Sequence, residues 1–103
     1  MEKHLSDVRR YDALADAAVV GRIVGHLGLS VYGCEGAHVA TTEPAALDRV
    51  KTEWCGDRLG ARDDFHVERT LELVCRTMEA DPCKERVTFY YLCAKHLGKL
   101  GAI

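Results

Sequence analysis

The segment from Asp81 to Lys99 constrains the fold most, because its apolar residues do not keep to one side of a helix. Asp81 and Pro82 provide an N-cap and a first-turn proline, the usual start of a helix. At about 100° per residue, the apolar positions cover more than half of the helix circumference. These positions are Cys83, Val87, Phe89, Tyr90, Tyr91, Cys93, Ala94 and Leu97. A helix that is apolar on most sides is buried on most sides. We therefore expect it to be central, with the other helices packed around it.

The N-terminal segment has the narrower stripe of a helix that covers a core on one side. Ser6 or Asp7 can cap it. Its apolar positions are Val8, Tyr11, Leu14, Ala15, Ala18 and Val19. A longer helix would bring Arg22 onto this apolar face, so we expect the helix to end near Gly21. Residues 23–27 are then expected to form a separate short turn.

Two later segments repeat the one-sided pattern. Pro44 lies in the first turn of one, which ends at Gly60, and Asp63 or Asp64 caps the other. The apolar stripes consist of Leu47, Val50 and Trp54 in the former and of Val67, Leu71, Val74 and Met78 in the latter. Both segments are predicted to be amphipathic helices.

A chain of 103 residues, 48% hydrophobic and 29% charged, is long enough for one globular domain. We predict a single all-α domain over residues 1–103. It is a small bundle of three to four helices packed around a central C-terminal helix, with an ordered Gly-rich loop at about 28–42.

Charge and hydropathy limit the classes of partner that the chain is expected to bind. The net charge is −2, from 16 acidic and 14 basic residues, whereas nucleic-acid binding needs a basic excess. The chain shows no export signal and no apolar run of membrane-spanning length. We therefore expect a cytoplasmic protein without a nucleic-acid or membrane partner.

The five cysteines are the candidates for metal binding or catalysis. Cys34 and His38 lie in the predicted loop, and Cys93 and His96 lie one helical turn apart, so together they offer a tetrahedral zinc site. The alternative is reduced thiols that pack as small apolar side chains. The alternative is favoured because the short Cys-x2–4-Cys spacing is absent. We expect no metal or other cofactor. No catalytic residue is predicted either, because no nucleophile, base and orienting group are recognisable together.

Residues 89–91 are three consecutive aromatic residues whose directions differ by about 100° per step. At least one ring must therefore face another helix layer, a partner chain or solvent. The candidate interface consists of Trp54, Lys84, Arg86, Phe89, Tyr90 and Tyr91, and its expected partner is a second copy or another protein. The alternative is that the helix is covered on all sides within one domain, which is favoured for the rings themselves.

Two functions follow from these patterns. The favoured one is a non-enzymatic helical module that self-associates, as a homodimer or larger homo-oligomer, or binds a protein partner. The alternative is a small metal- or ligand-binding domain that uses Cys34, His38, Cys93 and His96.

Three segments carry a more specific pattern. The first is Gly-Leu-Ser-Val-Tyr at 28–32 with Glu35 and Val39. The second runs from Glu43 through Trp54 to Gly60, and the third is Lys-x-Arg-x-x-Phe-Tyr-Tyr-Leu at 84–92. Over about residues 28–98 these segments resemble a bacterial family catalogued as domain of unknown function 2853.

The resemblance implies a small, mainly helical bacterial protein and brings no known activity. Ser30, Tyr32 and Glu35 of its first segment form a candidate loop site. Trp54 stands where the family usually has Phe. The cysteines at 34, 55, 83 and 93 are additions to the family pattern, which weakens any site built on them.

Overall fold

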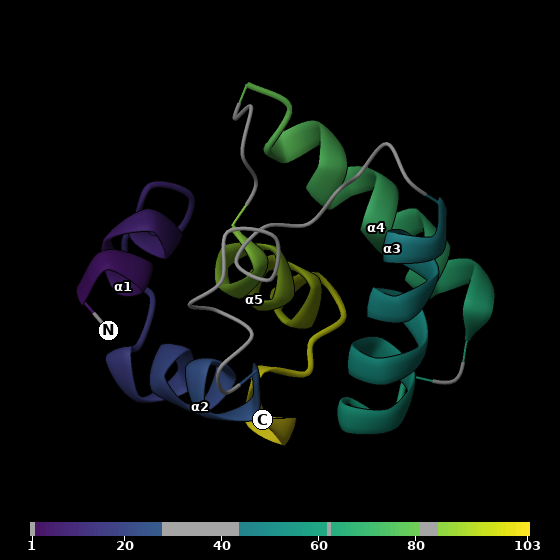
Figure 1. The fold of residues 1–103 in the computed structure, drawn as a ribbon, viewed down its shortest axis with the longest axis horizontal. Helices are drawn as coiled ribbons and strands as arrows, with labels where there is room; N and C mark the ends of the chain where they lie inside the picture. Colours follow the sequence, from purple (N-terminus) through teal and green to yellow (C-terminus); the bar gives the residue numbers. More distant parts are fainter. Residues whose placement is uncertain (1, 28–43, 62, 81–84) are drawn as a thin grey trace.

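A computed structural model describes residues 2–27, 44–61, 63–80 and 85–103. The regular elements in these ranges are helices, and the predicted all-α fold is confirmed (Figure 1). In chain order they are α1 (Glu2–Arg9), α2 (Ala17–Leu27), α3 (Pro44–Arg49), the π-helix η2 (Val50–Arg58), α4 (Asp64–Thr77), α5 (Arg86–His96) and the 3-10 turn η3 (Leu100–Ala102). The predicted Gly-rich loop at about 28–42 lies outside the described residues. Each helix in the described ranges is too short or too polar to cross a membrane.

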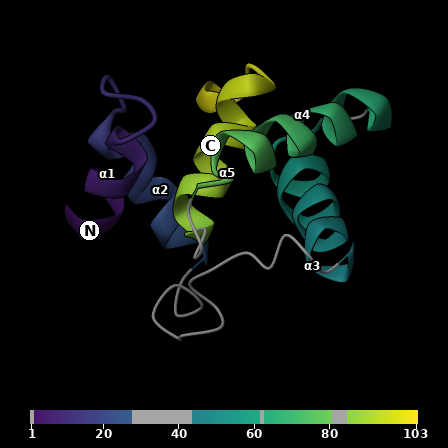
Figure 2. The same cartoon turned by 90° about the horizontal axis from the view of Figure 1, so that it is seen from above.

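α5 occupies the centre of the molecule, as its wide apolar arc predicts. It contacts α1, α2, η2 and α4. Figures 1 and 2 both show it between α1 and α2 on one side and α3 and α4 on the other. Every side chain from Val87 to Ala94 is buried. Burying a large apolar side chain contributes about 1.5–3 kcal/mol, so this helix supplies much of the stability of the fold.

The start of α5 differs from the prediction. Glu85 is its N-cap and is extended, with φ −63° and ψ 135°. The helix described here therefore begins at Arg86, because an extended residue interrupts helical winding. The predicted start at Asp81 and Pro82 lies outside the described residues.

The N-terminal region forms two helices rather than the one predicted from Ser6 or Asp7 to Gly21. α1 ends at Arg9, and α2 then runs from Ala17 through Gly21 to Leu27. Two aspartates cause the break, because their carboxylates accept backbone N–H groups that a continuous helix would use. Asp12 accepts from the Leu14 N–H at 3.1 Å, and Asp16 accepts from the Ala18 N–H at 2.8 Å.

The separate turn predicted for residues 23–27 is also wrong, since these residues continue α2. Leu14, assigned to the apolar stripe, is 93% exposed in the connection between α1 and α2. The prediction treated the connection as helix and therefore gave Leu14 a buried direction that the turn does not provide.

α3 continues directly into η2, whose winding is wider than that of an α-helix. The Leu59 N–H donates to the Trp54 carbonyl at 2.9 Å, an i→i−5 bond that defines a π-helix. Because roughly four to five residues then complete a turn, residues spaced by four, five and nine positions come to one side. The buried residues of this segment are Val50, Trp54, Cys55 and Leu59. Gly60 ends it in the left-handed region, with φ +70°.

α4 follows its prediction closely. The Asp63 carboxylate accepts from the His66 N–H at 3.2 Å, which makes Asp63 the N-cap. The predicted apolar stripe, Val67, Leu71, Val74 and Met78, is buried. The opposite side of α4 therefore faces outward, and this side is part of the candidate site.

Candidate functional site

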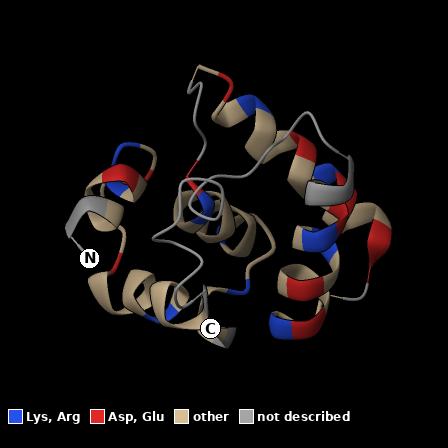
Figure 3. Ribbon diagram, viewed as in Figure 1, with Lys and Arg blue, Asp and Glu red and all other residues tan. Residues whose placement is uncertain are grey.

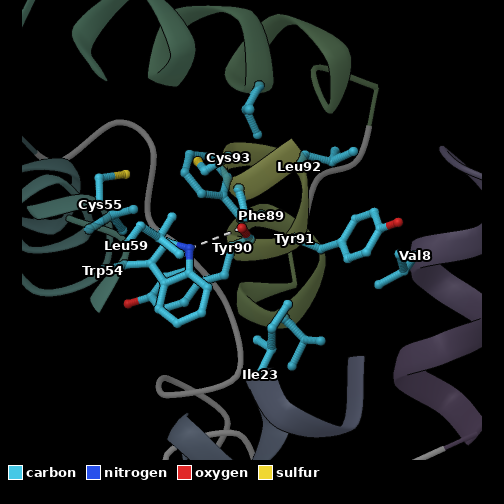
Figure 4. Packing of buried hydrophobic residues seen from close by; sticks show 14 of the residues in the cluster. Val8, Ile23, Trp54, Cys55, Leu59, Phe89, Tyr90, Tyr91, Leu92 and Cys93 are labelled. Carbon is cyan, nitrogen blue, oxygen red and sulfur yellow. Dashed lines mark hydrogen bonds between the residues drawn. The ribbon is translucent and has the colours of Figure 1, made fainter. Parts of the chain in front are cut away.

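Trp54 and Tyr90 form the centre of the aromatic cluster (Figure 4). The Trp54 Nε1–H donates to the Tyr90 carbonyl at 3.0 Å, and the two rings stack with centroids 4.8 Å apart. The His26 ring of α2 lies 5.1 Å from the Trp54 ring. Trp54 is 0% exposed. It therefore joins η2 to α5 and contacts α2, with its only polar atom satisfied.

The predicted aromatic interface is not exposed on this fold. Phe89, Tyr90 and Tyr91 are buried, as is Trp54. These aromatic side chains instead follow the alternative of cover within one chain. The other helices surround α5, so each of its faces has a neighbour from the same chain. This corrects the assignment of these rings to a partner-facing surface.

Of the two cations of that candidate interface, Arg86 is among the described residues. Arg86 is half-buried, and its guanidinium hydrogen-bonds the Tyr90 side chain. Burial nevertheless raises the pKa of Tyr90 above its ordinary value. Arg86 is therefore engaged within the chain. Lys84 lies outside the described residues.

Asp12 connects the turn after α1 to α5. The Tyr91 O–H donates to Asp12 Oδ2 at 2.7 Å, and Lys95 Nζ lies 3.4 Å from the same oxygen. The hydrogen bond from Tyr91 lowers the pKa of Asp12 below its ordinary value. Burial, together with the Asp12 carboxylate, raises the pKa of Tyr91 to about 12. Asp7 adds a second link, since it accepts a hydrogen bond from Thr88 and pairs with Arg10 at 2.6 Å. These contacts hold α1 and its following turn on α5, which is a structural role.

The cysteines on the described part of the chain form no metal site with one another or with other described residues. Cys93 is buried beside Cys55, its hydrogen-bonding partner, whereas His96 is exposed. Burial raises the pKa of Cys93 well above its ordinary value, which keeps the thiol protonated and unreactive. The described residues contain no group of three His, Cys, Asp or Glu side chains that could hold a metal ion. The other proposed ligands, Cys34 and His38, lie outside the described residues, as do Ser30, Tyr32 and Glu35 of the candidate loop site.

A groove of about 550 Å³ lies between the α3–η2 rod and α4. We call it the α3–α4 groove; it is lined by Leu47, Asp48, Lys51, Glu68, Leu71, Glu72, Cys75 and Arg76. Lys51 pairs with Glu68 at 3.1 Å and lies 4.0 Å from Asp64. The hydrogen bond with Glu68 raises the pKa of Lys51. The groove thus combines apolar side chains with a rim of both charge signs.

The outward side of α4 adjoins this groove and carries exposed apolar side chains. Phe65 is 69% exposed and Leu73 is 46% exposed. The Arg69 guanidinium lies over the Phe65 ring, 5.8 Å from its centroid. We define the α4 surface as Phe65, Arg69, Glu72, Leu73 and Arg76. Figure 3 shows the mixed charges of α3, η2 and α4, whereas the ribbon of α2, on the other side of α5, is nearly uncharged.

A family model described as a protein of unknown function (DUF2853) matches residues 3–101. The chain belongs to this family. The match confirms the resemblance found in the sequence and extends it over the N-terminal helices. No curated protein matches the chain. Membership of the DUF2853 family brings no known activity.

Sequence reasoning missed Phe65 and Leu73. It predicted an amphipathic helix, whose outward side is expected to be polar, and Glu68, Arg69 and Arg76 are exposed there. The signal was nevertheless present, because Phe65 and Leu73 lie off the buried stripe of a helix whose period is clear. An apolar residue away from the stripe is expected to be exposed unless another element covers it.

Proposed function

We propose that this protein is a non-enzymatic helical module that binds protein through the α4 surface and the adjoining α3–α4 groove. The supporting observation is the exposure of Phe65 and Leu73 on one helix. A single exposed apolar side chain is ordinary. Two large ones on the outward side of one helix, on a surface that shares Glu72 and Arg76 with a groove of partly apolar lining, are typical of a surface that a partner covers.

The groove supports binding by a helix or extended segment of a protein. Leu47 and Leu71 offer apolar contacts, while Asp48, Glu72 and Arg76 at the rim can pair with polar groups of either charge. A mixed rim does not suit a phosphate backbone, which attracts cations alone.

Chemistry of the groove supports a binding role rather than catalysis. Lys51 is the lysine of the lining, and its pairing with Glu68 raises its pKa and keeps it protonated. A protonated lysine is neither a nucleophile nor a general base. Glu68 in turn is occupied by Lys51, so this pair serves to shape the rim.

Photo-crosslinking in cells tests this proposal. A benzophenone amino acid replaces Leu73 in one variant and Leu14, 93% exposed and outside the α4 surface, in a matched control. We expect a protein adduct from position 73, none from position 14, and loss of the adduct when Phe65→Ser is added. The mass of the adduct then shows whether the partner is a second copy or another protein. Equal crosslinking from both positions, or none from position 73, would contradict the proposal.

A further inference from the structure

The α4 surface has a charge order that is complementary to itself. At about 100° per residue, positions 65, 69, 72 and 76 fall within an arc of roughly 60°. This arc lies opposite the buried stripe that includes Val67 and Val74. Along the arc the order is Phe65, Arg69, Glu72, Arg76. Arg69 and Glu72 are its middle pair and carry opposite charges.

We propose that the partner of the α4 surface is α4 of a second copy of this chain, packed antiparallel about a two-fold axis between Arg69 and Glu72. This inference rests on the proposed function and names its partner. About that axis, Arg69 lies opposite Glu72 of the second copy, and the same ion pair forms again by symmetry. Opposite charges therefore meet twice without any further adjustment.

The aromatic end of the arc fits the same arrangement. Phe65 lies four positions before Arg69, and Arg76 lies four positions after Glu72. Phe65 of each copy therefore meets Arg76 of the other, and the guanidinium can stack on a ring that is 69% exposed in the single chain. Leu73 flanks the arc and adds apolar area.

The opposite orientation is disfavoured by charge. A parallel pair in register would place Arg69 beside Arg69 and Glu72 beside Glu72, and like charges at close range repel.

The small size of the contact limits its strength. One helix packed on one helix buries less than the roughly 1,200–2,000 Å² of a stable interface. We therefore expect reversible association in the micromolar to millimolar range. Its exposed ion pairs make it weaker at high ionic strength.

Charge-swap variants test the arrangement by sedimentation velocity across concentrations. Arg69→Glu and Glu72→Arg each replace two attractive contacts with two repulsive ones, and we expect each to weaken self-association roughly tenfold. The double variant R69E/E72R restores both pairs and should associate like the wild type. Mixing the two single variants should likewise restore a heterodimer, since one then presents acids where the other presents bases.

Arg58→Glu is the matched control, because it makes the same charge change on an exposed residue at the end of η2. It should leave association unchanged. Circular dichroism confirms that every variant folds. Wild-type chain that stays monomeric up to about 1 mM, or a double variant and a mixture that associate no better than the single variants, would overturn the inference. A crosslink from position 73 to a different protein, with a monomeric chain, would overturn it and leave the proposed function standing.

Discussion

Replacing Trp54 by Phe probes the contact that joins η2 to α5. The substitution removes the hydrogen bond from Nε1 to the Tyr90 carbonyl, 3.0 Å long and buried. A buried hydrogen bond contributes about 1 kcal/mol. The smaller ring also leaves space in a site that is 0% exposed, at a cost of about 1 kcal/mol, similar to trimming a buried Ile to Val. We expect Trp54→Phe to lower the free energy of unfolding by about 2 kcal/mol.

Urea denaturation followed by far-UV circular dichroism measures this loss. Tryptophan fluorescence is unsuitable because Trp54 is the single tryptophan of the chain. Leu14→Ala is the control; its side chain is 93% exposed, and its effect should stay within about 0.5 kcal/mol. A Trp54→Phe variant no less stable than the control would refute the assignment of Trp54 to the core.

Three further predictions concern other buried contacts. Because the folded-state pKa of Asp12 is lowered, its contribution to stability is present above the ordinary carboxylate pKa and lost as the pH falls through the folded value. Asp12→Asn should therefore lower the free energy of unfolding by about 1–2 kcal/mol at pH 7 and by little near pH 2. Urea denaturation at both pH values measures this difference. The pKa of Tyr91, raised to about 12, implies a contribution to stability that is present below pH 10 and lost as the pH rises toward 12. When the melting temperature is measured against pH, Tyr91→Phe should remove this contribution to the loss of stability at alkaline pH. Cys93 should not react with a thiol reagent in the folded protein and should react fully in urea. Mass spectrometry of the labelled peptides measures this difference, and rapid labelling of the folded protein would contradict the burial of Cys93.

The sequence predicts the centre of the fold well because one physical signal decides it. The apolar arc of residues 87–94 is too wide for a helix on the surface, and those residues are the buried helix α5. The N-cap at Asp63 and the apolar stripe of α4 are predicted equally well, because both depend on the spacing of residues close together in the sequence.

The errors arise where the same local sequence pattern is compatible with two backbone conformations. Asp12 and Asp16 fit the polar face of a helix, but their carboxylates also cap backbone N–H groups and break the chain into α1 and α2. The π-helical winding that buries Cys55 is also invisible to a search at α-helical period. The same holds for the rings of the candidate interface, which are buried: a wide aromatic arc predicts cover on all sides, without stating whether the cover comes from the same chain.

Hydroxyl-radical footprinting tests the central claim most directly, namely that α5 is innermost and that the outward side of α4 is the partner-facing surface. The chain offers a matched pair in its two phenylalanines, Phe65 on α4 and Phe89 on α5. The account predicts rapid oxidation of Phe65 and slow oxidation of Phe89 in dilute protein. At high protein concentration Phe65 should become protected, while Leu14 remains reactive. Equal oxidation of Phe65 and Phe89, or protection of Leu14 in place of Phe65, would contradict it.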